Sequence, residues 1–179
     1  MKTQILIFVL LLVSVMQSQE KKVTRVGEVT FESKTSIEDI YAKNSQAASI
    51  FLLHEKTVAF NVLLRSFKFD KALMQEHFNE KYVHSDKYPS AKFKGVIIDD
   101  IDLKSPKKHS DVELDGIMEF HGVTKPIKVT ADIVVKSDQS IVFTSVFKLK
   151  LEDYKVAVPA LMKDKISPEI VVNVRANYK

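Results

Sequence analysis

The sequence predicts an all-β protein of about eight antiparallel strands with one short amphipathic helix. Eight stretches alternate apolar and polar residues, which is the period of a strand with one buried and one wet face. Short segments rich in turn residues join most of them, and the lack of strand–helix–strand alternation argues against a parallel sheet. Eight such strands can bury one face by closing into a barrel or by packing as a sandwich, and the pattern leaves both open.

The first 18 residues predict a secretory signal peptide. Lys2 supplies the positive start, the apolar run 5–13 follows, and small or polar residues lead to Ser18. The run is too short for a transmembrane helix, which needs about 20 apolar residues. We therefore expect cleavage after Ser18 and an exported domain, 19–179, that is secreted or periplasmic. The chain has no cysteine, which excludes disulfides, thiol catalysis and a lipid-anchored cysteine.

The strands follow from the alternation read in chain order. One of the clearest is 127–136, in which Ile127 and Val129 alternate with Lys128 and Thr130. By the same criterion the strands lie at 29–33, 48–53, 58–65, 91–101, 112–121, 127–136, 141–149 and 170–177. Lysines occupy many of the wet positions, and the net charge is +4. They are not clustered with stacking aromatic residues, so the pattern does not indicate a nucleic-acid partner.

The connections are predicted from turn residues and from changes of phase. Residues 36–42 predict a helical turn or irregular crossover, and 54–56 a tight turn. At Ser66 the apolar phase flips, which predicts a bulge or a strand end. The charged run 105–111 predicts a solvated hairpin loop, and glycine and proline place a turn at 122–126.

Residues 73–82 predict the helix. Met74, Phe78 and Tyr82 are four residues apart and share one helical face. Asp70 is the predicted N-cap, because its carboxylate can accept hydrogen bonds from the free amides of the first turn. We interpret this helix as a lid that lies between two strands and packs its apolar face on the rest of the protein.

The apolar phase of the strands is rich in phenylalanine, although the chain has no tryptophan. An eight-stranded barrel is just wide enough to be filled by side chains or to hold one small ligand. Periodicity does not distinguish a filled interior from a hollow one, so both remain open at this point. The residues predicted to face the interior are Phe31, Phe51, Phe60, Val62, Leu64, Phe93, Ile97, Leu114, Met118, Phe120, Ala131, Ile133, Phe143, Phe147 and Val172.

No spacing in the sequence indicates catalysis or a metal site. The string EHFNEK, 76–81, half matches a metalloprotease helix, but Lys81 stands where the second histidine ligand would be needed. A nucleophile elbow and a phosphate-binding glycine loop are also missing from the sequence. The sequence therefore predicts a protein that is not an enzyme and has neither a metal nor a resident cofactor.

Three blocks of the sequence together resemble a known family. They are LMQEHFNEKYVHSDKYPSAKFKG (73–95), EDIYAKNSQA (38–47) and FHGVTKPIKV (120–129). With the strands between them they cover most of the chain after about Val23. They resemble the YceI-like family of lipid- or polyisoprenoid-binding envelope proteins, in particular its secreted members from the Bacteroidetes lineage.

The resemblance implies a closed, lipocalin-like barrel in which the interior residues named above contact a long isoprenoid or alkyl chain. It also implies that residues of the matching blocks ring the mouth, namely Tyr41, Asn44, Met74, His77, Phe78, Asn79, Tyr82 and His84. The alternative for the polar members of this set is that they cap turns and fix the lid, as asparagine often does.

The function implied by the resemblance is a secreted or periplasmic binding protein. It would hold a polyisoprenoid or quinone-like chain in the lumen for sequestration or transport, and this lipid would be its partner. The alternative is an envelope stress or interaction protein that uses the barrel as a scaffold. An enzyme that acts on a lumen-bound lipid is a third interpretation. The sequence leaves the oligomeric state open.

Overall fold

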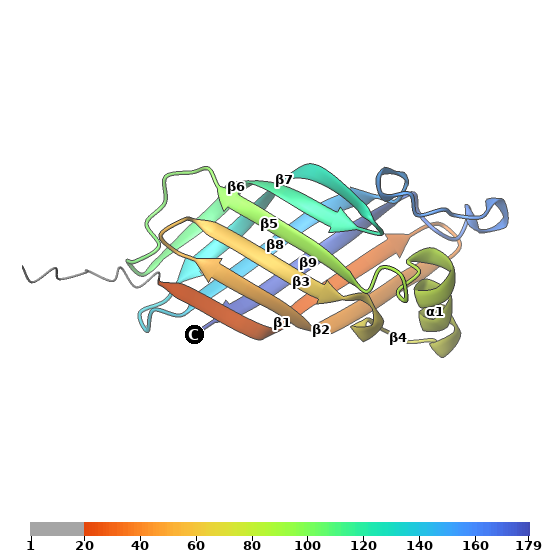
Figure 1. Ribbon diagram of the computed structural model, residues 1–179, viewed down its shortest axis with the longest axis horizontal. Helices are drawn as coiled ribbons and strands as arrows, with labels where there is room; N and C mark the ends of the chain where they lie inside the picture. The colour runs from red at the N-terminus through yellow and green to blue at the C-terminus, as the bar shows by residue number, and fades with distance from the viewer. Residues whose placement is uncertain (1–19) are drawn as a thin grey trace, which may run out of the picture.

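The computed structural model describes residues 20–179, and the predicted signal peptide, 1–18, lies outside them. Within that part, eight long strands surround one interior and a short helix lies at one end (Figure 1). The strands are β1 (Lys21–Lys34), β2 (Asp39–Leu52), β3 (Thr57–Leu63), β5 (Ser90–Ile97), β6 (Lys107–Phe120), β7 (Val123–Val135), β8 (Ile141–Lys150) and β9 (Glu169–Tyr178), with a two-residue strand β4 (Lys68–Phe69).

The strands form a closed antiparallel barrel. Each strand pairs with its neighbours in the order β1-β9-β8-β7-β6-β5-β3-β2, and β1 pairs with β2 to close the ring, while β4 adds to β2. This confirms the predicted eight-stranded barrel and rules out the sandwich. The β1–β2 pairing shifts register at Gly27, where a Cβ atom would lie 2.9 Å from the carbonyl oxygen of Ala47, so a glycine is needed for this close approach.

The crossover predicted at 36–42 is wrong, because this segment is a hairpin tip followed by the start of β2. The Thr35 hydroxyl oxygen accepts hydrogen bonds from the amides of Ile37 and Glu38, and it donates to the Glu38 carbonyl. This turn reverses the chain within a few residues. Residues from Asp39 onward are then free to pair with β1.

Two other connections differ from the prediction. The strand predicted at 91–101 ends at Ile97 and β6 begins at Lys107, so the charged run 105–111 is loop only as far as Pro106 and its remainder is strand. The turn after β6 is confined to His121 and Gly122. Pro126 therefore lies within β7, opposite Ile117 of β6. Proline is tolerated there because β7 pairs with β8 only over Ala131–Val135 among the described residues, so no ladder on that side needs its amide.

The lid consists of α1 (Ala72–His77), which continues as a wider π-helical turn, η2, at Phe78–Tyr82. The predicted cap at Asp70 is wrong: the N-cap is Lys71, whose side chain makes no capping hydrogen bond. The predicted change at Ser66 is confirmed as a strand end, because the 3₁₀ turn η1 (Leu64–Ser66) follows β3. It re-aims the next residues toward the barrel end that the lid covers.

The interior divides along the barrel axis into two clusters. The half away from the lid is packed solid around Phe51, Ile133 and Tyr178, which are among the largest fully buried side chains. The half beneath the lid is bordered by a second cluster that extends from the strands into α1, η2 and the β8–β9 connection. The difference between these halves determines where a ligand can be held.

Candidate functional site: an apolar cavity beneath the lid

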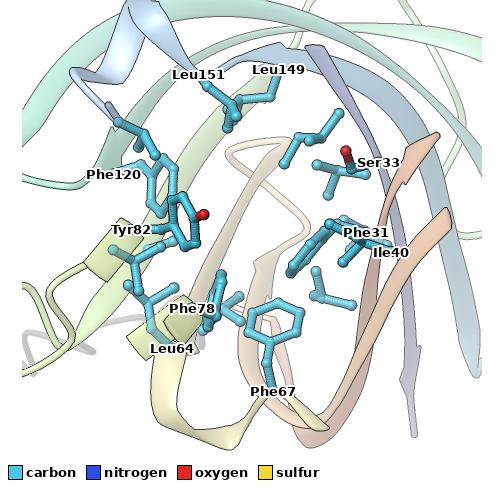
Figure 2. A pocket seen from close by; sticks show the side chains of 18 of the residues that line it. Phe31, Ser33, Ile40, Leu64, Phe67, Phe78, Tyr82, Phe120, Leu149 and Leu151 are labelled. Carbon is cyan, nitrogen blue, oxygen red and sulfur yellow. The ribbon is translucent and has the colours of Figure 1, made fainter. Parts of the chain in front are cut away.

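A cavity of about 200 Å³ occupies the lid half of the barrel. This volume far exceeds the roughly 10–15 Å³ that one water molecule requires. Its wall is apolar except for six residues, which are Ser33, Glu38, His77, Tyr82, Lys92 and Ser145. Figure 2 shows side chains from the strands and from the lid pointing into one common space.

The structure divides the fifteen predicted interior residues between the cavity and the solid half. Ten line the cavity: Phe31, Phe60, Val62, Leu64, Phe93, Met118, Phe120, Phe143, Phe147 and Val172. The other five lie in the solid cluster: Phe51, Ile97, Leu114, Ala131 and Ile133. Alternation indicates which side chains face inward, but it does not tell how far along the barrel axis each one lies.

Several lining residues escaped the sequence analysis. Some lie on the apolar phase of strands, such as Val29 and Val129, and alternation could have found them. Others come from the β8–β9 connection, which includes the 3₁₀ turns η3 (Glu152–Tyr154) and η4 (Ala160–Met162). Val156, Met162 and Ile166 of this connection line the cavity, and no periodic pattern marks them.

Phenylalanines join the lid to the barrel. The Phe78 ring stacks on Phe31 with centroids 5.5 Å apart and an interplanar angle of 28°. It also meets Phe67 at 5.8 Å and Phe69 at 5.1 Å. Phe31 makes edge contacts with both of these rings, so four rings from β1, the η1–β4 segment and the lid form one cluster. Each such pair adds roughly 0.5–1.5 kcal/mol beyond area burial.

Most polar groups in the cavity wall already have partners. The Ser33 hydroxyl accepts from the Ser167 amide, and the Ser145 hydroxyl donates to the Thr130 carbonyl. Tyr82 differs, because its hydroxyl points into the open space in Figure 2. Burial raises the pKa of Tyr82, which keeps the phenol neutral.

Glu38 and His77 of the wall contact neighbours on or next to the lid, whereas Lys92 pairs with Glu119 of β6. Glu38 forms an ion pair with Lys71 at 3.3 Å, which ties the β1–β2 hairpin to the residue before α1. His77 and Lys81 are in contact at 3.0 Å, one turn apart on the lid. The cavity is therefore apolar in its depth, with charged groups on the segments that surround its mouth.

Four residues predicted at the mouth line the cavity, and four do not. Met74, His77, Phe78 and Tyr82 are lining residues, whereas Tyr41, Asn44, Asn79 and His84 are not. Tyr41 points to solvent. The fully buried Asn44 donates to the Leu63 carbonyl and accepts from the Gln46 amide, each at 2.8 Å. Asn79 donates to the Gln75 carbonyl, so both asparagines fix the local chain.

His84 takes part in a bridge that the sequence did not predict. Its Nδ1 lies 2.9 Å from Nε2 of His121, whose own Nδ1 lies 2.9 Å from the Tyr154 carbonyl oxygen. Because a carbonyl only accepts, His121 Nδ1 donates to it, and His121 Nε2 can then accept from His84. The bridge joins the chain after the lid to the β6–β7 turn and to η3.

The described residues contain no group of three or more histidine, aspartate or glutamate side chains placed to hold a metal ion. Among residues 20–179, no helix has the length and apolar character needed to cross a membrane.

Comparisons with known proteins agree with the closed barrel fold described above. A model of the YceI-like domain matches residues 15–178. The chain belongs to the YceI-like family. By sequence, no curated protein matches this YceI-like chain.

Solved structures share the fold of this YceI-like domain. A polyisoprenoid-binding domain from Saccharophagus degradans, implicated in plant cell wall breakdown, has a TM-score of 0.73 at 12% identity, covering 89% of this chain and 97% of that one. BcnA from Burkholderia cenocepacia has a TM-score of 0.71 at 13% identity, covering 86% and 96%. A YceI protein from Campylobacter jejuni has a TM-score of 0.56 at 20% identity, covering 69% and 72%.

Proposed function

We propose that this protein binds one long apolar lipid, a polyisoprenoid or quinone-like chain, in the cavity beneath the lid, and sequesters or transports it outside the cytoplasm. The observation that carries the proposal is the cavity of about 200 Å³ with an almost wholly apolar wall. Binding needs no catalytic group, so we propose a carrier rather than an enzyme. The similarity to a polyisoprenoid-binding domain and the resemblance to secreted Bacteroidetes members support this choice.

The physical basis of binding is the removal of apolar surface from water. At roughly 25 cal/mol per Å², a chain that buries several hundred Å² gains on the order of 10 kcal/mol before the costs of ordering are subtracted. Such a gain is not specific for one head group. Selectivity would come from chain length and width, and from the few polar groups near the mouth, of which the Tyr82 hydroxyl faces the cavity.

The experiment that tests this function is native mass spectrometry followed by reloading. The protein is purified without added lipid, analysed intact, delipidated, and titrated with isoprenoid alcohols of graded length. We expect one lipid per chain and an upper limit on the length accepted. A protein that purifies empty and takes up none of these chains would contradict the carrier function and favour the scaffold alternative.

Two adjacent residues of β3 offer a matched pair for this titration. Val62 lines the cavity, whereas Leu63 is exposed on the outer face of the same strand. Val62→Phe places a ring in the space that the lipid would occupy, so it should weaken binding by at least about tenfold and shorten the longest chain accepted. Leu63→Phe adds the same ring outside and should leave both quantities unchanged.

A further inference from the structure

The β8–β9 connection places one apolar side chain almost fully in water at the lid end of the barrel. Leu161 in η4 is 94% exposed, more than any other large hydrophobic side chain among the described residues. Its neighbour Met162 points the opposite way and lines the cavity. The segment projects beyond the strands at the same end as α1 (Figure 1). A leucine held outward in this way is available for contact with something apolar outside the protein.

The residues around Leu161 carry positive charge. Lys155, Lys163 and Lys165 lie on this segment, and none of them forms an ion pair with a described residue. The only acidic residue between positions 155 and 165 is Asp164, so the segment has a net charge of +2. An apolar tip flanked by lysines is the pattern of a segment that rests on an anionic lipid surface.

Two other exposed apolar side chains lie at the same end, on separate segments. Ile37 is at the tip of the β1–β2 hairpin, and Leu73 is on the outer side of α1. The Glu38–Lys71 ion pair joins these two segments beside the cavity mouth. Because these apolar residues lie on three separate segments, they match a soft lipid surface better than a groove in a protein partner.

We propose that the lid end docks on the surface of an anionic lipid bilayer, with Leu161 inserted among the acyl chains and the three lysines at the head groups. The cavity mouth then faces the membrane, which is where a lipid too apolar to cross water must enter or leave. This inference rests on the proposed function for its purpose, although the docking itself can be measured without any cavity ligand.

The first test is co-sedimentation of the mature protein with vesicles of phosphatidylcholine alone or with 30 mol% phosphatidylglycerol. We expect binding to the anionic vesicles that weakens as salt rises from 50 to 500 mM. Leu161→Asp should weaken the partition by about 10- to 100-fold, the range expected for one buried leucine. The control Ile98→Asp changes another exposed apolar residue, just after β5 at the opposite end of the barrel, and should leave vesicle binding unchanged.

The second test separates docking from ligand binding by means of the adjacent pair. Leu161→Asp should slow lipid uptake from vesicles at least about tenfold but leave uptake from detergent-dispersed lipid unchanged. Met162→Asp places a carboxylate in the cavity wall and should abolish uptake from both sources while vesicle binding persists.

The outcomes distinguish failure of the docking from failure of the carrier function. Wild-type protein that takes up dispersed lipid but does not bind anionic vesicles would overturn the docking alone. Vesicle binding without any lipid uptake would overturn the carrier function alone. Concentration-dependent self-association that Leu161→Asp removes, together with no vesicle binding, would show that a second copy covers this surface, and it would also overturn the docking.

Discussion

A phenylalanine in place of Ala131 should destabilise the fold, whereas one in place of Val62 should leave its stability nearly unchanged. Both residues face the interior, but Ala131 lies in the solid half and Val62 in the wall of the cavity. Ala131 is buried opposite Val112 of β6 and Ser145 of β8. Ala131 itself does not line the cavity, so a benzyl group there must displace buried neighbours, and the closed strands on both sides prevent the wall from moving outward.

The magnitude follows from these surroundings. Overpacking typically costs 1–3 kcal/mol, and we expect Ala131→Phe to cost about 3 kcal/mol, because the whole ring must be accommodated. For a domain of this size, 1 kcal/mol changes Tm by roughly 2–4 °C, so the expected fall in Tm is about 6–12 °C. Val62→Phe should change the free energy of unfolding of delipidated protein by less than about 1 kcal/mol, because its ring enters the cavity.

The assay is thermal unfolding of delipidated protein followed by far-ultraviolet circular dichroism, since the chain has no tryptophan for fluorescence. Leu63→Phe serves as the control, because substitutions at exposed positions usually change stability by no more than about 0.5 kcal/mol. Equal losses of about 3 kcal/mol for Ala131→Phe and Val62→Phe would mean that the lid half is also packed. A neutral Ala131→Phe would mean that the far half is not solid. Either result would refute the division of the barrel.

Three further predictions concern the lid, the histidine bridge and the buried end. Phe78→Ala should cost about 1–3 kcal/mol in urea unfolding, because Phe78 is half-buried and a fully buried ring typically costs 3–5 kcal/mol. The control Leu73→Ala, at an exposed residue of the same helix, should be nearly neutral. A loss under about 0.5 kcal/mol at Phe78 would contradict the ring cluster. His121→Asn, which tolerates the φ of 49° at this position, should speed amide hydrogen exchange around His84, and unchanged exchange would argue against the bridge. Burial raises the pKa of Tyr178 far above 10.0, so the unfolded chain loses the phenol proton first as pH rises. The free energy of unfolding should therefore fall above about pH 10, by up to about 1.4 kcal/mol per pH unit. Tyr178→Phe should lessen this dependence on pH, and an unchanged dependence would contradict the raised pKa of Tyr178.

The sequence predicted the barrel well because its evidence is local. Alternation along each strand depends only on which side chains face inward, and closure then needs no information beyond the number of strands and the family resemblance. The prediction from sequence was wrong where a single contact or a missing pairing determines the path of the backbone. Hydrogen bonds to the Thr35 hydroxyl make a hairpin tip where a crossover was predicted. Proline is tolerated within β7 because β8 does not pair with β7 beside Pro126.

The site was only partly predictable, because it depends on the position along the barrel axis. Phe60 and Phe51 have the same pattern on neighbouring strands and belong to one buried cluster, yet only Phe60 borders the cavity. Met162 and Leu161 carry no periodic signal at all, and only the fold of η4 places one inward and one outward. Tertiary packing, rather than strand pattern, therefore determines which apolar residues can contact a ligand.

The same packing closes the cavity at the end away from the lid, so the cavity is a pocket and not a tunnel. Phe60 and Phe143 meet across its depth with centroids 5.5 Å apart. The Phe93 ring covers Gly95 and Gly116, where added Cβ atoms would lie 2.6 and 2.5 Å from it, so these paired glycines create the room that this ring fills. Behind this floor the half away from the lid is solid. A chain that occupies the cavity must therefore enter and leave at the lid end, where the exposed Leu161 and its lysines lie, and its length is limited by a floor that no single strand determines.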